Sequence, residues 1–322
     1  MVIFSIIIPH FNSTDSLNKL IGTIPNAKEI EIIIIDDHSD PSEKRELLKL
    51  KERYSFKNVT FLNNTPDKKG AGACRNIGLM QASGEWVLFA DSDDYFLEDF
   101  YKIIQKYSSS GLDVVFLKPT SIEFDSGEVS DRHLPYVKLI DHYKINPDIN
   151  SEIRLRYFYH VPWSKLINKR FIKKYNIYFD EVIASNDVMF STKVGYHMEN
   201  FEVSDEKIYC VTRSEGSLTT TISPKVFKTR LDVFICYYRF LKEFALNKDE
   251  FKLIKLNVSG RYTLLNSFNF GYKQSVLVYK KLRENKIHII DREYFNPIFL
   301  IKKAYSFYIS RRKKKKYIKL YQ

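Results

Sequence analysis

Apolar residues in the first ninety positions gather in short unbroken runs, and polar stretches separate these runs. Each run is rich in β-branched and aromatic residues, which favours a strand buried on both faces of a parallel sheet. Four runs are predicted to be such strands: residues 3–8, 30–35, 59–62 and 86–90. After the first run, apolar residues follow the helical spacing i, i+3, i+4 and i+7, at Leu17, Leu20, Ile21 and Ile24.

Two later stretches between the runs carry helix signals. Asp40 can cap a helix whose first residue is Pro41, and Glu43 would complete a capping box. Gly70–Ala73 leads into a helix of small residues that is expected to continue through Gln81. The alternation of strands and helices predicts an α/β sheet with right-handed crossovers.

Beyond residue 110 the pattern is less regular. The remaining expected elements are a strand at 113–118, a hairpin-like stretch around Gly127 at 121–129, a helix-rich segment to about residue 200 and a late strand at 209–211. From Pro224 onward the chain is expected to be mostly helical, because apolar residues recur at helical spacing, at Phe227, Leu231, Phe234 and Ile235.

Two clusters of acidic residues follow predicted strands. Asp36-Asp37 ends the second run, and Asp91-Ser92-Asp93-Asp94 ends the fourth. Ligands of open α/β sheets bind at the carboxyl ends of the strands, where both clusters are expected. Neighbouring carboxylates repel one another, and a hard divalent cation that prefers oxygen ligands relieves the repulsion. Taken alone, a solvated acidic turn explains the Asp91–Asp94 cluster better than a metal site does, and a helix cap explains Asp36-Asp37 equally well.

Four segments within residues 1–100 carry a resemblance to a known family: Ser5–Asn12, Ile35–Ser39, Gly72–Gly78 and Phe89–Asp94. In this order they resemble the opening strand, the nucleotide-binding acid motif, the small-Ala-Arg-Asn-x-Gly segment and the DxD stretch of family 2 glycosyltransferases, which have the GT-A fold. His38 stands where the family usually has Gly, and Cys74 stands where it usually has Ala.

Three later segments are more weakly similar to bacterial polysaccharide members of the family: Pro162–Ile167, Ser185–Phe190 and Arg213–Thr219. They resemble the Trp-x-Lys-Leu segment, the Glu-Asp-x-x-Phe segment and the Arg-x-x-Gly-Ser loop. The resemblance implies a Rossmann-like GT-A domain over residues 1–222, with a nucleotide-binding half at 1–110 and an acceptor half at 111–222. A helical extension is expected at 223–322.

The resemblance also implies roles for individual residues. Asp37 would bind the nucleotide base, favouring uracil, and Asp91 would lie near the ribose. Arg75 would face the nucleotide, because its planar donors suit a base edge or a phosphate. Asp93 would hold Mg²⁺ or Mn²⁺ against the diphosphate, where the metal acts as a Lewis acid. The nucleotide-sugar is expected to contact Pro9, Phe11, Asp36, Asp37, Arg75, Asp91 and Ser92.

Transfer with inversion at the anomeric carbon, as in the family, requires one general base. Asp187 occupies the matching position and is the predicted base. Asn186 stands where the family often has an acid, so Asp180 and Glu181 remain alternatives. Trp163 and Lys165 are candidates for acceptor binding; Trp163 would offer a ring for sugar stacking, although a buried structural tryptophan is as well supported.

Charge is concentrated at the C-terminal end of the chain. The formal net charge is +12, of which residues 301–322 contribute nine Lys and Arg and no acid. Basic residues flanked by aromatic ones suit an anionic membrane surface. A solvated tail or unspecific nucleic-acid binding is the alternative, and no specific nucleic acid is expected. No run reaches the roughly 18 apolar residues of a membrane span.

The location of the protein is predicted from its cysteines and its first residues. Its three cysteines form no CxxC pair, so a reducing compartment is favoured over a disulfide framework. The apolar run at residues 2–9 lacks a basic leader and a cleavage site, and is interpreted as a strand rather than a secretion signal. A cytoplasmic protein at the inner face of the cell membrane is expected.

These features favour a metal-dependent inverting glycosyltransferase, which moves a sugar from a UDP-sugar to a saccharide or lipid-linked acceptor in surface polysaccharide synthesis. Two alternatives remain open. One is a non-catalytic binder of nucleotide or polysaccharide on the same scaffold. The other is a phosphatase with Asp91 as nucleophile, which fits the preceding ninety residues less well.

Overall fold

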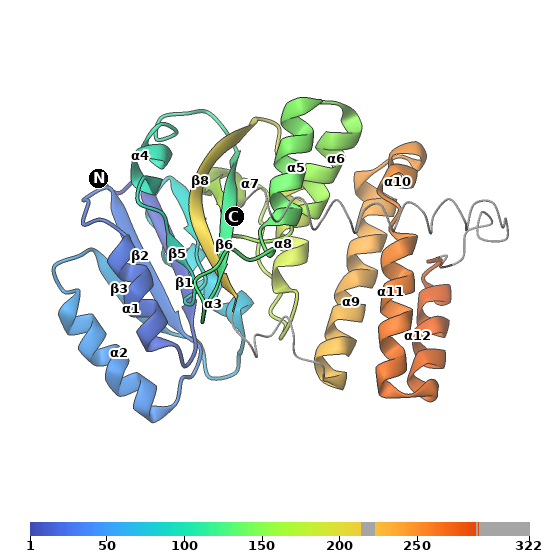
Figure 1. The fold of residues 1–322 in the computed structure, drawn as a ribbon, viewed down its shortest axis with the longest axis horizontal. Coiled ribbons are helices and arrows are strands. Elements are labelled where there is room, and N and C mark those ends of the chain that lie inside the picture. Colours follow the sequence, from blue (N-terminus) through green and yellow to red (C-terminus); the bar gives the residue numbers. More distant parts are fainter. Residues whose placement is uncertain (214–222, 288, 290–322) are drawn as a thin grey trace. The chain divides into compact units, whose positions relative to one another are not determined.

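The computed structural model describes residues 1–213, 223–287 and 289 (Figure 1). The chain divides into two compact units, Met1–Thr221 and Ile222–Gln322. The basic segment 301–322 lies outside the described residues, as does all of the predicted loop 213–219 except Arg213.

The first unit is built on one eight-stranded sheet with the order β3-β2-β1-β4-β7-β6-β8-β5. Its strands are β1 (Phe4–His10), β2 (Ile30–Asp36), β3 (Val59–Asn63), β4 (Trp86–Phe89), β5 (Tyr95–Phe96), β6 (Val114–Glu123), β7 (Lys165–Asn168) and β8 (Phe201–Arg213). Strands β1 to β4 pair in parallel, as do β6 and β8. Strand β7 is antiparallel to β4 and β6, and β5 is antiparallel to β8, so the sheet is mixed.

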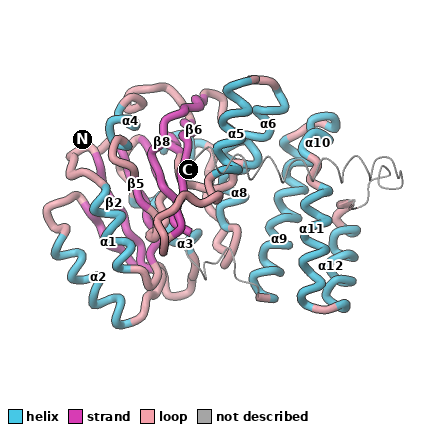
Figure 2. Tube along the Cα trace, viewed as in Figure 1, coloured by secondary structure: helices cyan, strands magenta, loops and turns pink. Residues whose placement is uncertain are grey.

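Helices cover both faces of this sheet (Figure 2). Ile6 and Ile8 of β1 join a core with α1 (Thr14–Thr23), α2 (Pro41–Arg53) and α4 (Phe100–Gln105). Ile7 points to the other face, because side chains alternate along a strand. The core on that face is completed by α3 (Ala71–Gln81), α5 (Leu134–Ile145), α6 (Ile149–Phe158), α7 (Lys169–Lys174) and α8 (Asn186–His197).

The strands expected from the apolar runs are confirmed at β1 to β4, and so is the helix that ends at Gln81. The hairpin-like stretch is also confirmed, because Ile122 and Val129 form an antiparallel bridge. The predicted capping box is wrong. Helix α2 begins at Pro41, but the Asp40 side chain makes no capping hydrogen bond. Glu43 instead accepts hydrogen bonds from the backbone N–H and the hydroxyl of Thr14, at the start of α1.

The acceptor half contributes more strand than expected. Strand β7 falls in the segment expected to be rich in helix, and β8 extends eight residues N-terminal to the predicted Tyr209. Strand β7 is only four residues long and joins β4 to β6 in the middle of the sheet. Its conformation is therefore determined by pairing with distant strands rather than by its own residue pattern.

The described part of the second unit, residues 223–287, is mostly helical, as expected from the residues after Pro224. It contains α9 (Pro224–Phe240), a π-helical turn (Leu241–Ala245), α10 (Lys248–Ile254), α11 (Asn257–Ser267), a 3₁₀ turn (Phe268–Phe270) and α12 (Tyr272–Glu284). In sequence this unit is strongly basic, with 24 Lys and Arg against 7 Asp and Glu, a net charge of +17. The first unit has 27 against 32, a net charge of −5. None of the described helices is long and apolar enough to cross a membrane.

Candidate active site

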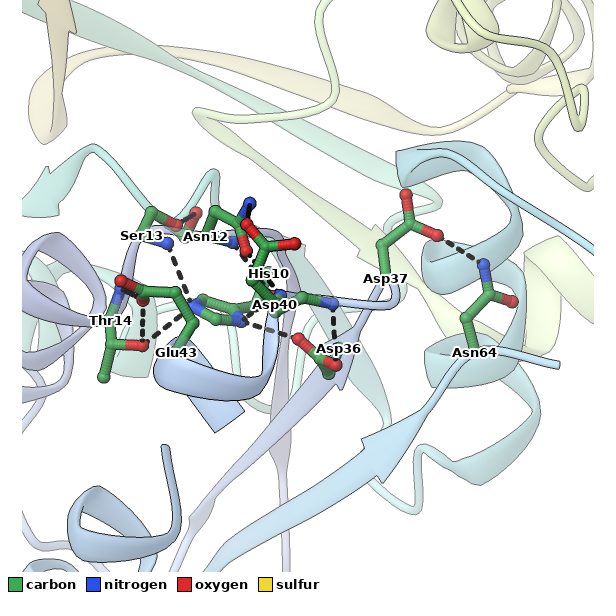
Figure 3. A network of polar contacts seen from close by, with 11 residues as sticks. His10, Asn12, Ser13, Thr14, Asp36, Asp37, Asp40, Glu43 and Asn64 are labelled. Carbon is green, nitrogen blue, oxygen red and sulfur yellow. Dashed lines mark hydrogen bonds and ion pairs between the residues drawn. The ribbon is translucent and has the colours of Figure 1, made fainter. Parts of the chain in front are cut away.

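A buried network joins the loop after β1 to the loop after β2 (Figure 3). His10 Nδ1 lies 3.0 Å from Asp36 Oδ1, and the Ser39 N–H donates to Asp36 Oδ2 at 3.2 Å. Both Asp36 oxygens therefore have protein partners, and the residue is only 1% exposed. The Asp36 side chain thus holds the two loops together, and its contact with the nucleotide stays a prediction.

Asp37 fixes the segment that precedes α3. Its carboxylate accepts hydrogen bonds from Asn64 Nδ2 at 2.7 Å and from the Gly70 N–H at 2.8 Å. Nearby, the exposed ring of Phe11 has Lys69 Nζ 5.3 Å from its centroid. Pro9, by contrast, is buried within β1. Asp37 and Phe11 thus lie where β1 and β2 end, at the edge expected to receive a nucleotide.

Four non-glycine residues with left-handed backbone stand within two positions of candidate site residues. They are Asn12, His38, Ser164 and Ser185, with φ between 47° and 63°. Such conformations are costly for residues with a Cβ and persist where surrounding contacts hold them. At His38 the Thr65 and Lys68 carbonyls, 3.1 and 3.0 Å from Nε2, provide those contacts. The same backbone angle explains why glycine suits this position in the family motif.

Arg75 links the two halves of the first unit. From α3, its Nη2 donates to Asp91 Oδ1 at 2.5 Å and its Nη1 donates to Asn186 Oδ1 at 2.8 Å. The guanidinium also lies over the Phe179 ring, 5.3 Å from the centroid. Its Nε is buried and has no hydrogen-bond partner among the described residues. Arg75 therefore contacts the DxD acid Asp91 and brings the start of α8 beside it, while its predicted contact with the nucleotide stays a prediction.

Residues of β8 hold the turn Asp91–Asp94 in place through hydrogen bonds. The Tyr209 hydroxyl accepts from the Asp91 N–H and donates to Asp94 Oδ2, both at 2.8 Å. The Thr212 N–H donates to Asp94 Oδ1 at 2.7 Å. Burial, together with the neighbouring carboxylates, raises the pKa of Asp94, and these hydrogen bonds oppose that rise. From the other side, Ser92 Oγ lies 2.8 Å from Ser13 Oγ.

Asp93 is the carboxylate of this turn that faces solvent. Surrounding protein atoms desolvate it and, with Asp91 nearby, raise its pKa to about 6, while Arg132 opposes that rise. An unpaired carboxylate beside a second one suits a divalent cation. No cluster of three or more His, Cys, Asp or Glu that could hold a metal occurs among the described residues.

Asp187 lies in the first turn of α8, next to Asn186, and is partly exposed. Burial raises the pKa of its carboxyl, while Arg75 and Lys165 act in the opposite direction. A carboxylate with a raised pKa is a better proton acceptor near neutral pH. Of the two alternatives, Glu181 pairs with Lys68 at 2.8 Å, whereas burial raises the pKa of Asp180 as it does that of Asp187, so Asp180 remains an alternative.

Trp163 and Lys165, the candidates for acceptor binding, are each 2% exposed, so both side chains lie beneath the surface and their contact with the acceptor stays a prediction. The Trp163 ring stacks on Tyr209 and meets Tyr136 edge to face, with centroids 5.9 and 5.0 Å away. Lys165 Nζ donates to the Tyr159 carbonyl at 2.7 Å. Trp163 supports the DxD turn through Tyr209, since the buried indole packs against its anchor.

Sequence reasoning missed three members of this site: Tyr209, Asn64 and Arg132. Tyr209 was interpreted only as part of a short strand, and its partners lie more than a hundred positions earlier. Asn64 follows β3, and the rule that ligand-site residues follow parallel strands would have selected it. Arg132 follows the Gly127 hairpin, and its Nη1 donates to the Thr212 carbonyl at 3.2 Å.

Comparisons with known proteins identify the family and the fold. The sequence model described as Glycosyl transferase family 2 matches residues 5–176. The poly(ribitol-phosphate) β-N-acetylglucosaminyltransferase TarS of Staphylococcus aureus is 28% identical over 240 residues, which are 70% of this chain and 39% of TarS. A poly(ribitol-phosphate) β-glucosyltransferase of Bacillus spizizenii is 25% identical over 290 residues, 88% of this chain and 43% of the relative. The chain thus spans about two fifths of the length of these relatives.

Solved structures share the fold. TarS 1–349 of S. aureus in complex with UDP-GlcNAc has a TM-score of 0.70 at 21% identity, covering 94% of this chain and 88% of that one. A mannosyltransferase of Pyrobaculum calidifontis in complex with GDP-Man and Mn²⁺ has a TM-score of 0.53 at 11% identity, covering 87% and 75%. The expected GT-A fold with a helical C-terminal region is thereby confirmed.

Proposed function

Because the chain belongs to glycosyl transferase family 2, we propose that it transfers a sugar, with inversion, from a nucleotide-sugar to a hydroxyl group of a saccharide or lipid-linked saccharide. A UDP-sugar is the favoured donor, and surface polysaccharide synthesis is the favoured setting. The observation that carries this proposal is the Arg75 bridge between Asp91 and Asn186. It sets the DxD turn of the donor half beside the predicted base of the acceptor half.

On the donor side, Asp37 and the exposed Phe11 ring are the groups proposed to meet the base, with Asp91 near the ribose. Asp93 is proposed to hold Mg²⁺ or Mn²⁺, which supplies Lewis-acid stabilisation of the leaving nucleoside diphosphate when bound. The exposed position of Asp93 and the repulsion from Asp91 support this role. The Mn²⁺ in the Pyrobaculum complex is consistent with it.

On the acceptor side, Asp187 is proposed to take the proton of the acceptor hydroxyl during in-line attack. Its first-turn position in α8 favours the carboxylate, since helix N-termini stabilise negative charge. The Arg75 cation nearby stabilises it further.

Calorimetric titration with UDP, first with Mn²⁺ and then with EDTA, tests the donor half. We expect binding that requires Mn²⁺ and is lost in Asp93→Ala. Binding of GDP but not UDP would keep the fold and change the donor. No binding of any nucleotide would favour a non-catalytic role.

Asp187→Asn tests the acceptor half. We expect donor binding to persist and turnover to fall by at least about 100-fold, since a positioned base contributes about 10²–10⁴-fold. Wild-type turnover in this variant would refute the assignment of Asp187. Loss of donor binding would instead make Asp187 a nucleotide-facing residue.

The second unit is proposed to hold the enzyme at the inner face of the cell membrane. Its net charge of +17 supports contact with an anionic leaflet, where each basic residue contributes about 1 kcal/mol. Tyr262, Phe268 and Tyr272 are exposed on its described helices and suit the interfacial region. Deleting residues 311–322 is expected to release the protein from anionic vesicles without abolishing transfer to soluble acceptors. Equal vesicle binding without these residues would refute the role of this segment.

A further inference from the structure

Lys165 is a buried lysine whose charge is not matched by an ion pair. It begins β7 and is 2% exposed. Its Nζ donates to the Tyr159 carbonyl at 2.7 Å and lies 3.4 Å from Ser191 Oγ. The rings of Tyr159 and Phe116 lie beside it, with centroids 4.7 and 5.5 Å away. No carboxylate of the described residues pairs with it.

Stability alone does not explain a lysine at this position. Moving an ammonium group from water into a protein interior is costly, and neutral partners repay only part of that cost. A methionine fills nearly the same space without the penalty. We therefore expect the positive charge of Lys165 to have a role in the function of the site.

The neighbour on which this charge acts is Asp187. Lys165 contacts α8 at Ser191, which lies four residues after Asp187 and therefore one turn away on the same helix face. Asp187 is the charged group that raises the pKa of Lys165, against the lowering caused by burial. In return, Lys165 lowers the pKa of Asp187.

The other groups that face this pair come from several elements. Arg75 of α3 and Asp91 after β4 act on Asp187 with opposite signs. Tyr136 of α5 also faces Asp187, and its pKa is raised to about 12, so it stays neutral. His160 is near Lys165, and burial lowers its pKa to about 4, which leaves it uncharged near neutral pH.

Resting on the function proposed above, we propose that Lys165 is a positioning residue for Asp187: its ammonium ties α8 to the end of α6 and keeps the Asp187 carboxylate charged. The acceptor oxygen then forms its bond to the sugar C1 while the bond from C1 to the diphosphate breaks. Asp187 receives the acceptor proton, and Lys165 keeps its own protons. The pKa of Lys165, lowered to about 7, leaves it charged in the acidic range where Asp187 would otherwise be protonated.

The test measures the titration of Asp187 directly, by carboxyl ¹³C NMR, with Asp187→Asn giving the assignment. In Lys165→Met we expect the Asp187 midpoint to rise by about one pH unit, because a nearby cation has been removed. The acidic limb of the kcat profile should move by the same amount, with KM for the donor unchanged. Lys169→Met is the matched control: Lys169 Nζ donates to the Ala82 carbonyl instead, and we expect no shift.

The outcomes separate this proposal from the proposed function. An unchanged Asp187 midpoint in folded Lys165→Met overturns the role of Lys165, as does a loss of kcat that is equal at every pH. If the Met variant does not fold, Lys165→Gln keeps hydrogen-bond donors without the charge and gives the same comparison. A shifted midpoint in a protein that transfers no sugar would sustain the coupling and refute the transferase function.

Discussion

Removing the Tyr209 hydroxyl tests how the DxD turn is held. In Tyr209→Phe, the Asp91 N–H loses its acceptor and Asp94 Oδ2 loses its donor. The ring itself keeps its contacts with Trp163 and Phe96, so little cavity forms. The change is therefore confined to two hydrogen bonds in a buried network.

The magnitude follows from those two groups. Each buried polar group left without a partner costs about 1–3 kcal/mol. Because Asp91 is partly exposed and water can reach it, we expect a total loss of about 2–4 kcal/mol in the free energy of unfolding. For a unit of this size, that corresponds to a fall in Tm of about 4–16 °C.

Urea unfolding and calorimetry of UDP with Mn²⁺ are the assays. We expect lower stability and about tenfold weaker nucleotide binding, since a loosened turn misplaces Asp91 and Asp93. Tyr101→Phe is the control: its hydroxyl donates to Glu29 Oε2 at 3.0 Å, away from the turn. A Tyr209→Phe protein within about 0.5 kcal/mol of wild type, with unchanged binding, would refute the anchoring role.

Three further predictions concern pH and packing. Mn²⁺ with UDP should raise Tm more at pH 7.5 than at pH 5, because the pKa of Asp93 is raised to about 6 and acid neutralises its carboxyl; equal shifts would contradict the metal assignment. Lys165→Met should be more stable than wild type in thermal unfolding at pH 6, and this gain in stability should be smaller at pH 9.5. Burial lowers the pKa of Lys165 to about 7 in the native state, so the stability of the wild type rises as pH increases from about 7 to 10.5. A gain that does not depend on pH would argue against a buried ammonium group. Gly195→Ala should lower the free energy of unfolding in urea by about 1–3 kcal/mol, because the added Cβ would overlap the Arg156 carbonyl oxygen. Gly111→Ala is the control, since the space around Gly111 is open and no loss is expected. Unchanged stability in Gly195→Ala would show that α6 and α8 can move apart without cost.

The parallel strands of the first half could be predicted because their residues alone define them. Isoleucine runs such as 30–35 are too apolar for any surface and too short for most helices. Strand β7 could not be found this way, since it begins with a lysine whose burial depends on Tyr159 and Ser191. Its conformation comes from strands and helices distant in sequence.

The residues of the candidate site likewise fall into those that a local sequence pattern identifies and those that depend on distant contacts. Asp37, Arg75 and Asp93 follow local patterns, and the structure places Arg75 directly against Asp91. Glu43 shows where local patterns fail: its spacing fits a capping box, but its carboxylate accepts hydrogen bonds from Thr14 of another helix. Trp163 shows it too, because a tryptophan suits a sugar platform and a core equally, and only the neighbouring rings decide.

The position of β7 has a consequence for synthesis of the chain on the ribosome. Strand β4 ends at Phe89, yet the partner on its outer edge begins only at Lys165. At about 5–20 residues per second, that edge waits roughly 4–15 seconds for its neighbour. During this interval an apolar strand edge is open to pairing with other nascent chains. The yield of folded protein should therefore depend on translation speed between these two strands, which silent codon changes over residues 90–164 can alter without changing any residue.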